Sequence, residues 1–113
     1  MWLPLAGLLL GVAIGLVSSV SVPADYARYT GMAILAALDS LLGAVVAELN
    51  GEYRNDIFLA GLASNMFLAG GLTYLGDRIG VELYFAAIVA FGVRSFNNLA
   101  IIRRGLMARI RPS

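Results

Sequence analysis

The sequence predicts an all-α membrane protein with four transmembrane helices, and three observations support this prediction. Hydrophobic residues make up 60% of the chain. Charged residues make up only 13%, against roughly 25% in a typical soluble domain. Four apolar stretches of about 20 residues follow one another, and a helix of that length crosses the ~30 Å hydrocarbon core of a bilayer. By length, we expect residues 1–113 to form one integral membrane domain.

The first predicted helix covers residues 2–20. No Lys or Arg precedes its apolar run, so the positive region of a signal peptide is missing and we expect the helix to be retained. Gly7, Gly11 and Gly15 recur every four residues. Such a stripe of small residues lets another helix approach closely and pack by van der Waals contact. The partner helix can belong to the same chain or to a second copy.

The second predicted helix, residues 30–49, follows a connection over residues 18–29. It carries Asp39 at its centre, and Gly43 lies one turn further on the same face, where we expect it to serve helix packing. A polar loop over residues 48–56 comes next and contains the turn signal Asn-Gly.

The third and fourth predicted helices cover residues 57–75 and 83–104. The third has Ser64 and Asn65 near its middle, and residues 76–82 connect it to the fourth. We expect the arginines that end the fourth helix, and those of the tail, to anchor the chain at the membrane surface. These arginines are Arg103, Arg104, Arg109 and Arg111.

The distribution of arginine predicts the orientation of the chain. Four spans place both termini on one side of the membrane, together with Arg54 and the four surface arginines. Only Arg28 and Arg78 fall on the opposite side. Because cytoplasmic segments carry the excess of basic residues, we expect both termini in the cytoplasm. A three-span arrangement, with the first or second helix lying in the interface, is the alternative.

A shift of about 55 residues brings similar residues of the two halves together. The tetrapeptide LAGL occurs at residues 5–8 and 59–62, and the shift also aligns Tyr29 with Tyr84 and Asp39 with Arg94. The identities are few, so chance similarity competes with a helical hairpin that is repeated in the same orientation.

Two opposite charges lie at similar depths of the second and fourth helices. Asp39 lies about nine residues into its helix and Arg94 about eleven into its own, so at ~1.5 Å per residue their depths differ by ~3 Å. We therefore predict a buried ion pair, with Asn65, Asn97 and Asn98 supplying the remaining hydrogen bonds that such a pair needs. Either the pair fixes helix register, or it marks a path for an ion or polar solute.

The composition argues against several kinds of function. The chain has no Cys and no His, which removes thiol catalysis and the usual zinc or haem ligands. No phosphate-binding or nucleophile motif occurs. The acidic residues of the second loop surround an arginine, which favours a solvated loop over a metal site. We expect no enzyme activity, cofactor or metal, and the net charge of +1 gives no signal for nucleic acid.

Three blocks of sequence are distinctive. They read MWLPLAGLLLGVAIGL, PADYARYTGMAILAALDSLLG and LYFAAIVAFGVRSFNNLAIIRR. Together they resemble the small basic protein family of Gram-positive and related bacteria. The resemblance implies a multi-pass protein of the plasma (inner) membrane, of unknown function and often encoded beside cell-division and cell-wall genes. Asp39, Gly43, Arg94 and Asn98 fall inside the matching blocks. The chain departs from the family in being scarcely basic, with no lysine.

Two functions are expected from these observations. The first is a non-enzymatic assembly or scaffold component of the membrane, linked to envelope growth or division. We expect it to be a homo-oligomer, with other envelope or division membrane proteins as candidate partners. The alternative is a small oligomeric channel or carrier for an ion or polar solute, built around the Asp39–Arg94 pair.

Overall fold

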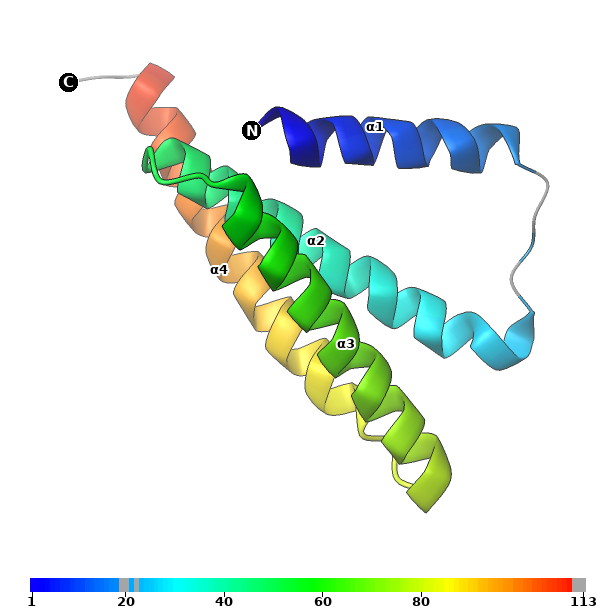
Figure 1. Cartoon of the computed structure of the whole chain (residues 1–113). Helices are drawn as coiled ribbons and strands as arrows, with labels where there is room; N and C mark the ends of the chain where they lie inside the picture. Colours follow the sequence, from blue (N-terminus) through cyan, green and yellow to red (C-terminus); the bar gives the residue numbers. More distant parts are fainter. Residues whose placement is uncertain (19–20, 22, 111–113) are drawn as a thin grey trace.

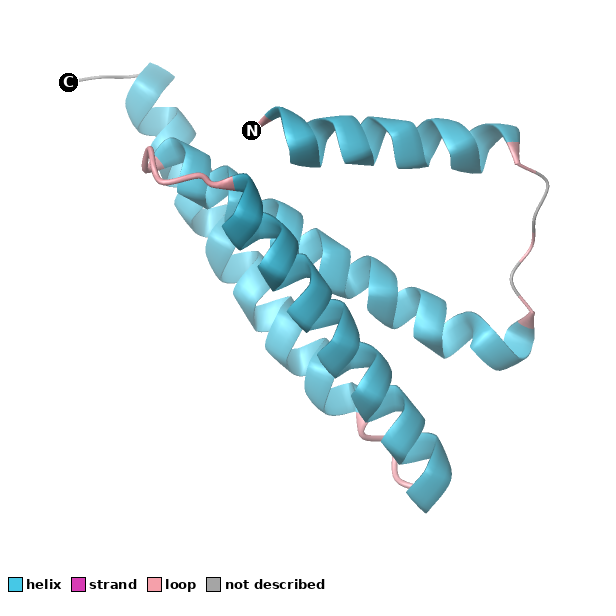
Figure 2. Cartoon of the chain, viewed as in Figure 1, coloured by secondary structure: helices cyan, strands magenta, loops and turns pink. Residues whose placement is uncertain are grey.

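The computed structural model describes residues 1–18, 21 and 23–110, and helices make up nearly all of that part (Figure 2). The elements are α1 (Trp2–Val17), the short 3-10 helix η1 (Ala24–Tyr26), α2 (Ala27–Leu49), α3 (Asn55–Ile79) and α4 (Tyr84–Ile110) (Figure 1). No strand occurs within these described ranges. The predicted all-α fold with four helices is confirmed.

Helices α2, α3 and α4 form a bundle in which α2 is central. It packs against both α3 and α4, which contact each other only sparsely. The buried core consists of three alanines and two larger side chains, namely Ala36, Ala69, Ala87, Met32 and Phe91. Alanine lets helix backbones approach closely, and in a bilayer helices associate through such packing rather than through hydrophobic burial.

Three helical segments are long and apolar enough to cross a membrane. They are Ala24–Leu49, Asn55–Ile79 and Tyr84–Ile110. Helix α1 has 16 residues, about 24 Å at 1.5 Å per residue, against ~30 Å for the hydrocarbon core. The structure therefore holds three full-length candidate spans and one shorter apolar helix.

Helix α1 lies apart from the bundle (Figure 1). It begins near the end of α2, where the Met1 amino group is 3.7 Å from Glu48 Oε2, and it diverges from α2 along its length. A Cβ atom added at any glycine of the stripe on α1 would meet no atom of the described residues within 4 Å. An apolar cleft of about 710 Å³, lined partly by Gly7 and Gly11, separates α1 from α2 and α3. The stripe thus has no close helix partner within the described part of its own chain.

The two halves of the chain do not form matching hairpins. Helix α3 has 25 residues and packs along α2, whereas α1 has 16 residues and diverges from α2. The physical difference lies in polar contacts. Asn65 on α3 bonds to α2 in mid-helix, whereas in the described part of the chain the polar contact at this end is the Met1–Glu48 ion pair, just before α1 begins.

The helix ends differ from the predicted boundaries. Helix α3 continues through most of the predicted connection 76–82 and ends at Ile79; the next residue, Gly80, has a φ of 76°, the left-handed conformation that terminates helices. Helix α4 extends past 104 to Ile110, and the Leu49 side chain packs close to its backbone at Gly105. Residues 19–20 of the first predicted helix lie outside the described residues. The predicted turn at Asn50-Gly51 is present, with a φ of 72° at Gly51.

Substituting Gly76 with alanine tests how tightly the α3–α4 connection is packed. An added Cβ would collide with the carbonyl oxygen of Val81 and lie 3.0 Å from the Leu83 nitrogen. Because backbone atoms cannot move aside cheaply, we expect Gly76→Ala to lower the free energy of unfolding by about 1–3 kcal/mol. Denaturant titration in detergent measures this change. Gly71→Ala is the control, because its Cβ meets nothing within 4 Å; equal stability of the two variants would contradict the prediction.

Candidate functional site

The Asp39 carboxylate on α2 and the Arg94 guanidinium on α4 form an ion pair. Arg94 Nη2 lies 3.2 Å from Asp39 Oδ2. The Asp39 residue is only 1% exposed, whereas the Arg94 side chain is 60% exposed. The acid is therefore buried inside the bundle, and the arginine reaches it from a helix surface along its flexible stem.

Asn65 on α3 brings the third helix into this cluster. Its Nδ2 donates to Asp39 Oδ2 at 3.0 Å and to Ser40 Oγ at 3.0 Å. A single carboxylate oxygen thus joins α2, α3 and α4. The second oxygen, Asp39 Oδ1, is buried and has no hydrogen-bond partner within the described residues. Leaving a buried acceptor unsatisfied costs about 1–3 kcal/mol.

A cleft of about 250 Å³ extends from this cluster to the loop between α2 and α3. Asp39, Asn65 and Arg94 line one part of it, and Glu52, Tyr53 and Arg54 of the loop line another. The Tyr53 hydroxyl is buried without a partner. Loss of hydration raises the pKa of this phenol above its usual value, and the nearby Glu48 carboxylate raises it further. Tyr53 therefore keeps its proton at neutral pH and offers a donor beside the cleft.

The remaining predicted members of the cluster lie elsewhere. Asn98 is half-buried and faces α2, with its Nδ2 4.0 Å from where a Cβ on Gly43 would be. Asn97 is exposed. Among the described residues, neither amide bonds to Asp39, so this part of the predicted network is wrong. The reason is helix geometry, because three or four residues beyond Arg94 a side chain lies about 4.5–6 Å further along the axis.

The surface arginines are placed at one end of the bundle. Arg103 and Arg104 are exposed. Arg109 Nη2 donates to the Leu49 carbonyl oxygen at 3.2 Å, which satisfies an acceptor at the C-terminal end of α2. Arg111 lies outside the described residues. No group of three or more His, Cys, Asp or Glu side chains suited to a metal occurs in the described part of the chain.

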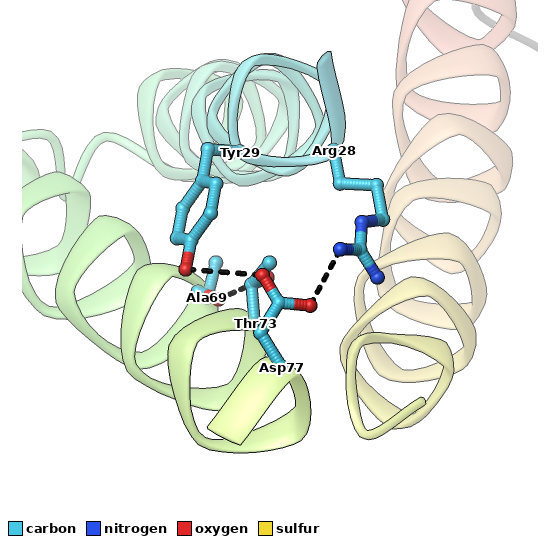
Figure 3. Close-up of polar contacts among 5 residues, drawn as sticks. All are labelled: Arg28, Tyr29, Ala69, Thr73 and Asp77. Carbon is cyan, nitrogen blue, oxygen red and sulfur yellow. Dashed lines mark hydrogen bonds and ion pairs between the residues drawn. The ribbon is translucent and has the colours of Figure 1, made fainter. Parts of the chain in front are cut away.

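A second polar cluster joins the same three helices at the opposite end, and sequence reasoning missed it. Arg28 Nη2 lies 2.6 Å from Asp77 Oδ1, and the Tyr29 hydroxyl donates to Asp77 Oδ2 at 3.4 Å (Figure 3). The Arg28 guanidinium also lies over the Tyr84 ring of α4, 5.6 Å from its centroid. We call this group the Arg28–Asp77 clamp. The sequence contained a signal for this cluster. Arg28 at the start of α2 and Asp77 near the end of α3 carry opposite charges, and these two helix ends adjoin.

Comparison with known proteins identifies relatives over most of the chain. A family described as "Protein of unknown function (DUF1290)" matches residues 22–107, the part that contains α2, α3 and most of α4. The small basic protein of Bacillus subtilis (strain 168) is 49% identical over 109 residues, covering 96% of this chain and 90% of the relative. An uncharacterized protein of Mycobacterium tuberculosis (strain ATCC 25618 / H37Rv) is 36% identical over 104 residues, covering 90% and 86%. No solved structure matches the chain.

Removing Arg94 tests whether the ion pair stabilises the bundle. Arg94→Leu leaves the Asp39 carboxylate buried and uncompensated, so we expect a loss on the order of 3–5 kcal/mol in the free energy of unfolding. Adding Asp39→Asn removes the stranded charge at nearly constant volume, and we expect the double variant to recover part of this loss. Unfolding in detergent, followed by circular dichroism, measures both. A double variant no more stable than Arg94→Leu would exclude a stabilising charge interaction.

Proposed function

We propose that this chain, which belongs to the small basic protein family (DUF1290), is a non-enzymatic, homo-oligomeric assembly component of the plasma membrane. In this role it associates with further copies of itself, and with other membrane proteins of envelope growth or division. The link to the envelope comes from the gene neighbourhood that the family resemblance implies. The membrane location in this proposal rests on the apolar helices, which are those of a membrane protein.

One observation carries the oligomeric part of the proposal, namely the exposure of Asn97 on α4. Its carboxamide has no hydrogen-bond partner within the described residues and lies inside an apolar candidate span. An amide that faces hydrocarbon loses the hydrogen bonds that water gives it, at a cost of several kcal/mol. Hydrogen bonding across a helix interface relieves that cost, and this is how polar residues drive association in membranes.

A second copy is the partner that best fits this amide. Copies inserted in the same orientation hold their Asn97 side chains at the same depth. A carboxamide is both donor and acceptor, so two of them can satisfy each other across a symmetric interface. The stripe of Gly7, Gly11 and Gly15 adds a second surface for close helix approach, because a Cβ added at any of the three would meet nothing within 4 Å in the described part of the chain.

The positions of the chain ends support a cytoplasmic location for both termini. Met1 lies beside Glu48 at the end of α2, and α4 ends beside Leu49 through Arg109. Figure 1 shows the N-terminus and the end of α4 toward the same end of the molecule. Four arginines belong to this end: Arg54, Arg103, Arg104 and Arg109. The positive-inside rule assigns such an end to the cytoplasm.

A small channel or carrier remains the second candidate function, and the cleft beside Asp39 favours it. The cleft connects an ionisable pair in mid-helix with the loop end of the bundle, and ionisable groups inside membranes often mark solute paths. Purified protein in liposomes, assayed for proton and monovalent-ion flux, tests this function. No flux above that of protein-free liposomes would count against it.

Replacing Asn97 tests the oligomer interface. We expect Asn97→Leu to weaken self-association in lipid nanodiscs or liposomes by about 3- to 20-fold, the equivalent of 0.6–1.7 kcal/mol for an interhelical hydrogen bond in a membrane. Single-molecule photobleaching over a range of protein-to-lipid ratios measures the dissociation constant. Val93→Leu on the same exposed face is the control, because it changes no polar group. A monomeric wild-type protein, or unchanged association of Asn97→Leu, would overturn the proposed interface.

A further inference from the structure

We infer that the cleft beside Asp39 is a water-filled vestibule that opens at the α2–α3 loop and ends at the Asp39–Arg94 pair. Its ligand is water bound at the carboxylate, and the vestibule admits other small polar solutes from the loop side only. This inference concerns a single chain, so it holds whether or not copies of the chain associate.

The first argument is the set of polar groups that line the cleft without enough partners. Asp39 Oδ1 and the Tyr53 hydroxyl have no hydrogen-bond partner in the described part of the chain. The Arg94 guanidinium has five N–H donors, and in the same part of the chain its partner is the Asp39 carboxylate. In hydrocarbon each unmet group costs several kcal/mol. Buried water characteristically binds such groups, at sites that offer two to four polar partners.

The second argument is the space and the side chains around it. The cleft has a volume of about 250 Å³, enough for several water molecules at roughly 30 Å³ each. Small residues from two helices line it, namely Gly43, Ala44, Ala47 and Gly61, and these keep it open. Glu52, Tyr53 and Arg54 of the loop supply a polar mouth. The cleft is therefore wide enough and polar enough to be hydrated from the loop end.

The third argument is that the bundle is closed on the other side of Asp39. The polar pair and the Arg28–Asp77 clamp are separated along all three helices by buried residues: Met32 and Ala36 on α2, Ala69 and Thr73 on α3, and Ala87 and Phe91 on α4. Thr73 turns its hydroxyl to the Ala69 carbonyl oxygen of its own helix, at 2.8 Å (Figure 3). This layer offers no free polar group to water, and the clamp covers its far side. Access to Asp39 is thus one-sided.

Thiol labelling of single-cysteine variants tests the vestibule directly, because the chain has no cysteine of its own. Ser40→Cys and Gly61→Cys place a thiol on the cleft wall. Ser64→Cys is the matched control, because Ser64 is exposed beside Asn65 and does not line the cleft. Asn50→Cys, in the loop turn, reports which side of the vesicle membrane carries the loop. The probe is a small membrane-impermeant methanethiosulfonate applied to full-length protein in liposomes.

We expect Ser40→Cys and Gly61→Cys to react at least tenfold faster than Ser64→Cys, and only from the side that labels Asn50→Cys. A thiol in water ionises and reacts, whereas a thiol in hydrocarbon does neither. Rates equal to that of Ser64→Cys would overturn the hydrated vestibule, and labelling from the opposite side would overturn its one-sided closure. Circular dichroism and gel filtration confirm that each variant is folded. Gly61→Cys adds a second position, because a Cβ there meets nothing within 4 Å.

Discussion

The need to satisfy one buried carboxylate organises this bundle. Asp39 is 1% exposed on the central helix, and hydrocarbon offers it neither water nor counter-ion. Its partners come from the two flanking helices, Asn65 on α3 and Arg94 on α4. Each contact is lost if either helix rotates or slides. The shared carboxylate oxygen therefore fixes the rotation and register of three helices, although the same oxygen would be costly to bury without partners. A buried polar group that specifies a single arrangement is a well-attested role for such groups.

The bundle is layered along its axis. The Arg28–Asp77 clamp lies at one end, followed by a dry layer around Ala36 and Phe91, and then by the Asp39–Arg94 pair with its cleft. On each helix successive layers lie three or four residues apart, which keeps their side chains on one face. The polar layers hold the helices at both ends of the dry layer, and the alanines within that layer allow their close approach. Structural support and a one-sided polar opening therefore come from the same three helix faces.

The sequence predicted how deep a residue lies along its helix, but not the direction in which the residue points around the helix axis. Depth follows from counting residues at a fixed rise, so the pairing of Asp39 with Arg94 was predictable. Rotation about the helix axis did not follow from the apolar pattern, since α4 has apolar residues on every side, and Asn97 and Asn98 were assigned to the wrong neighbours.

The clamp was missed because Gly76 and Gly80 together suggested a loop around Asp77. Only Gly80 has a positive φ, and Gly76 is a helical residue that makes room for the chain returning to α4. The position of α1 could not be predicted, because a glycine stripe indicates close packing without identifying the partner.

The order of the helices along the chain has a consequence for biogenesis. Arg94 is synthesised about 55 residues after Asp39, a delay of about 3–11 s at 5–20 residues per second. The acid-bearing helix therefore leaves the ribosome before the helix that carries its counter-ion. Asn65 is synthesised roughly halfway through the delay and brings the first hydrogen bond to the carboxylate. The α2–α3 hairpin is thus the unit that shelters the acid while the nascent chain is incomplete, and α4 completes the assembly when its arginine enters the bilayer.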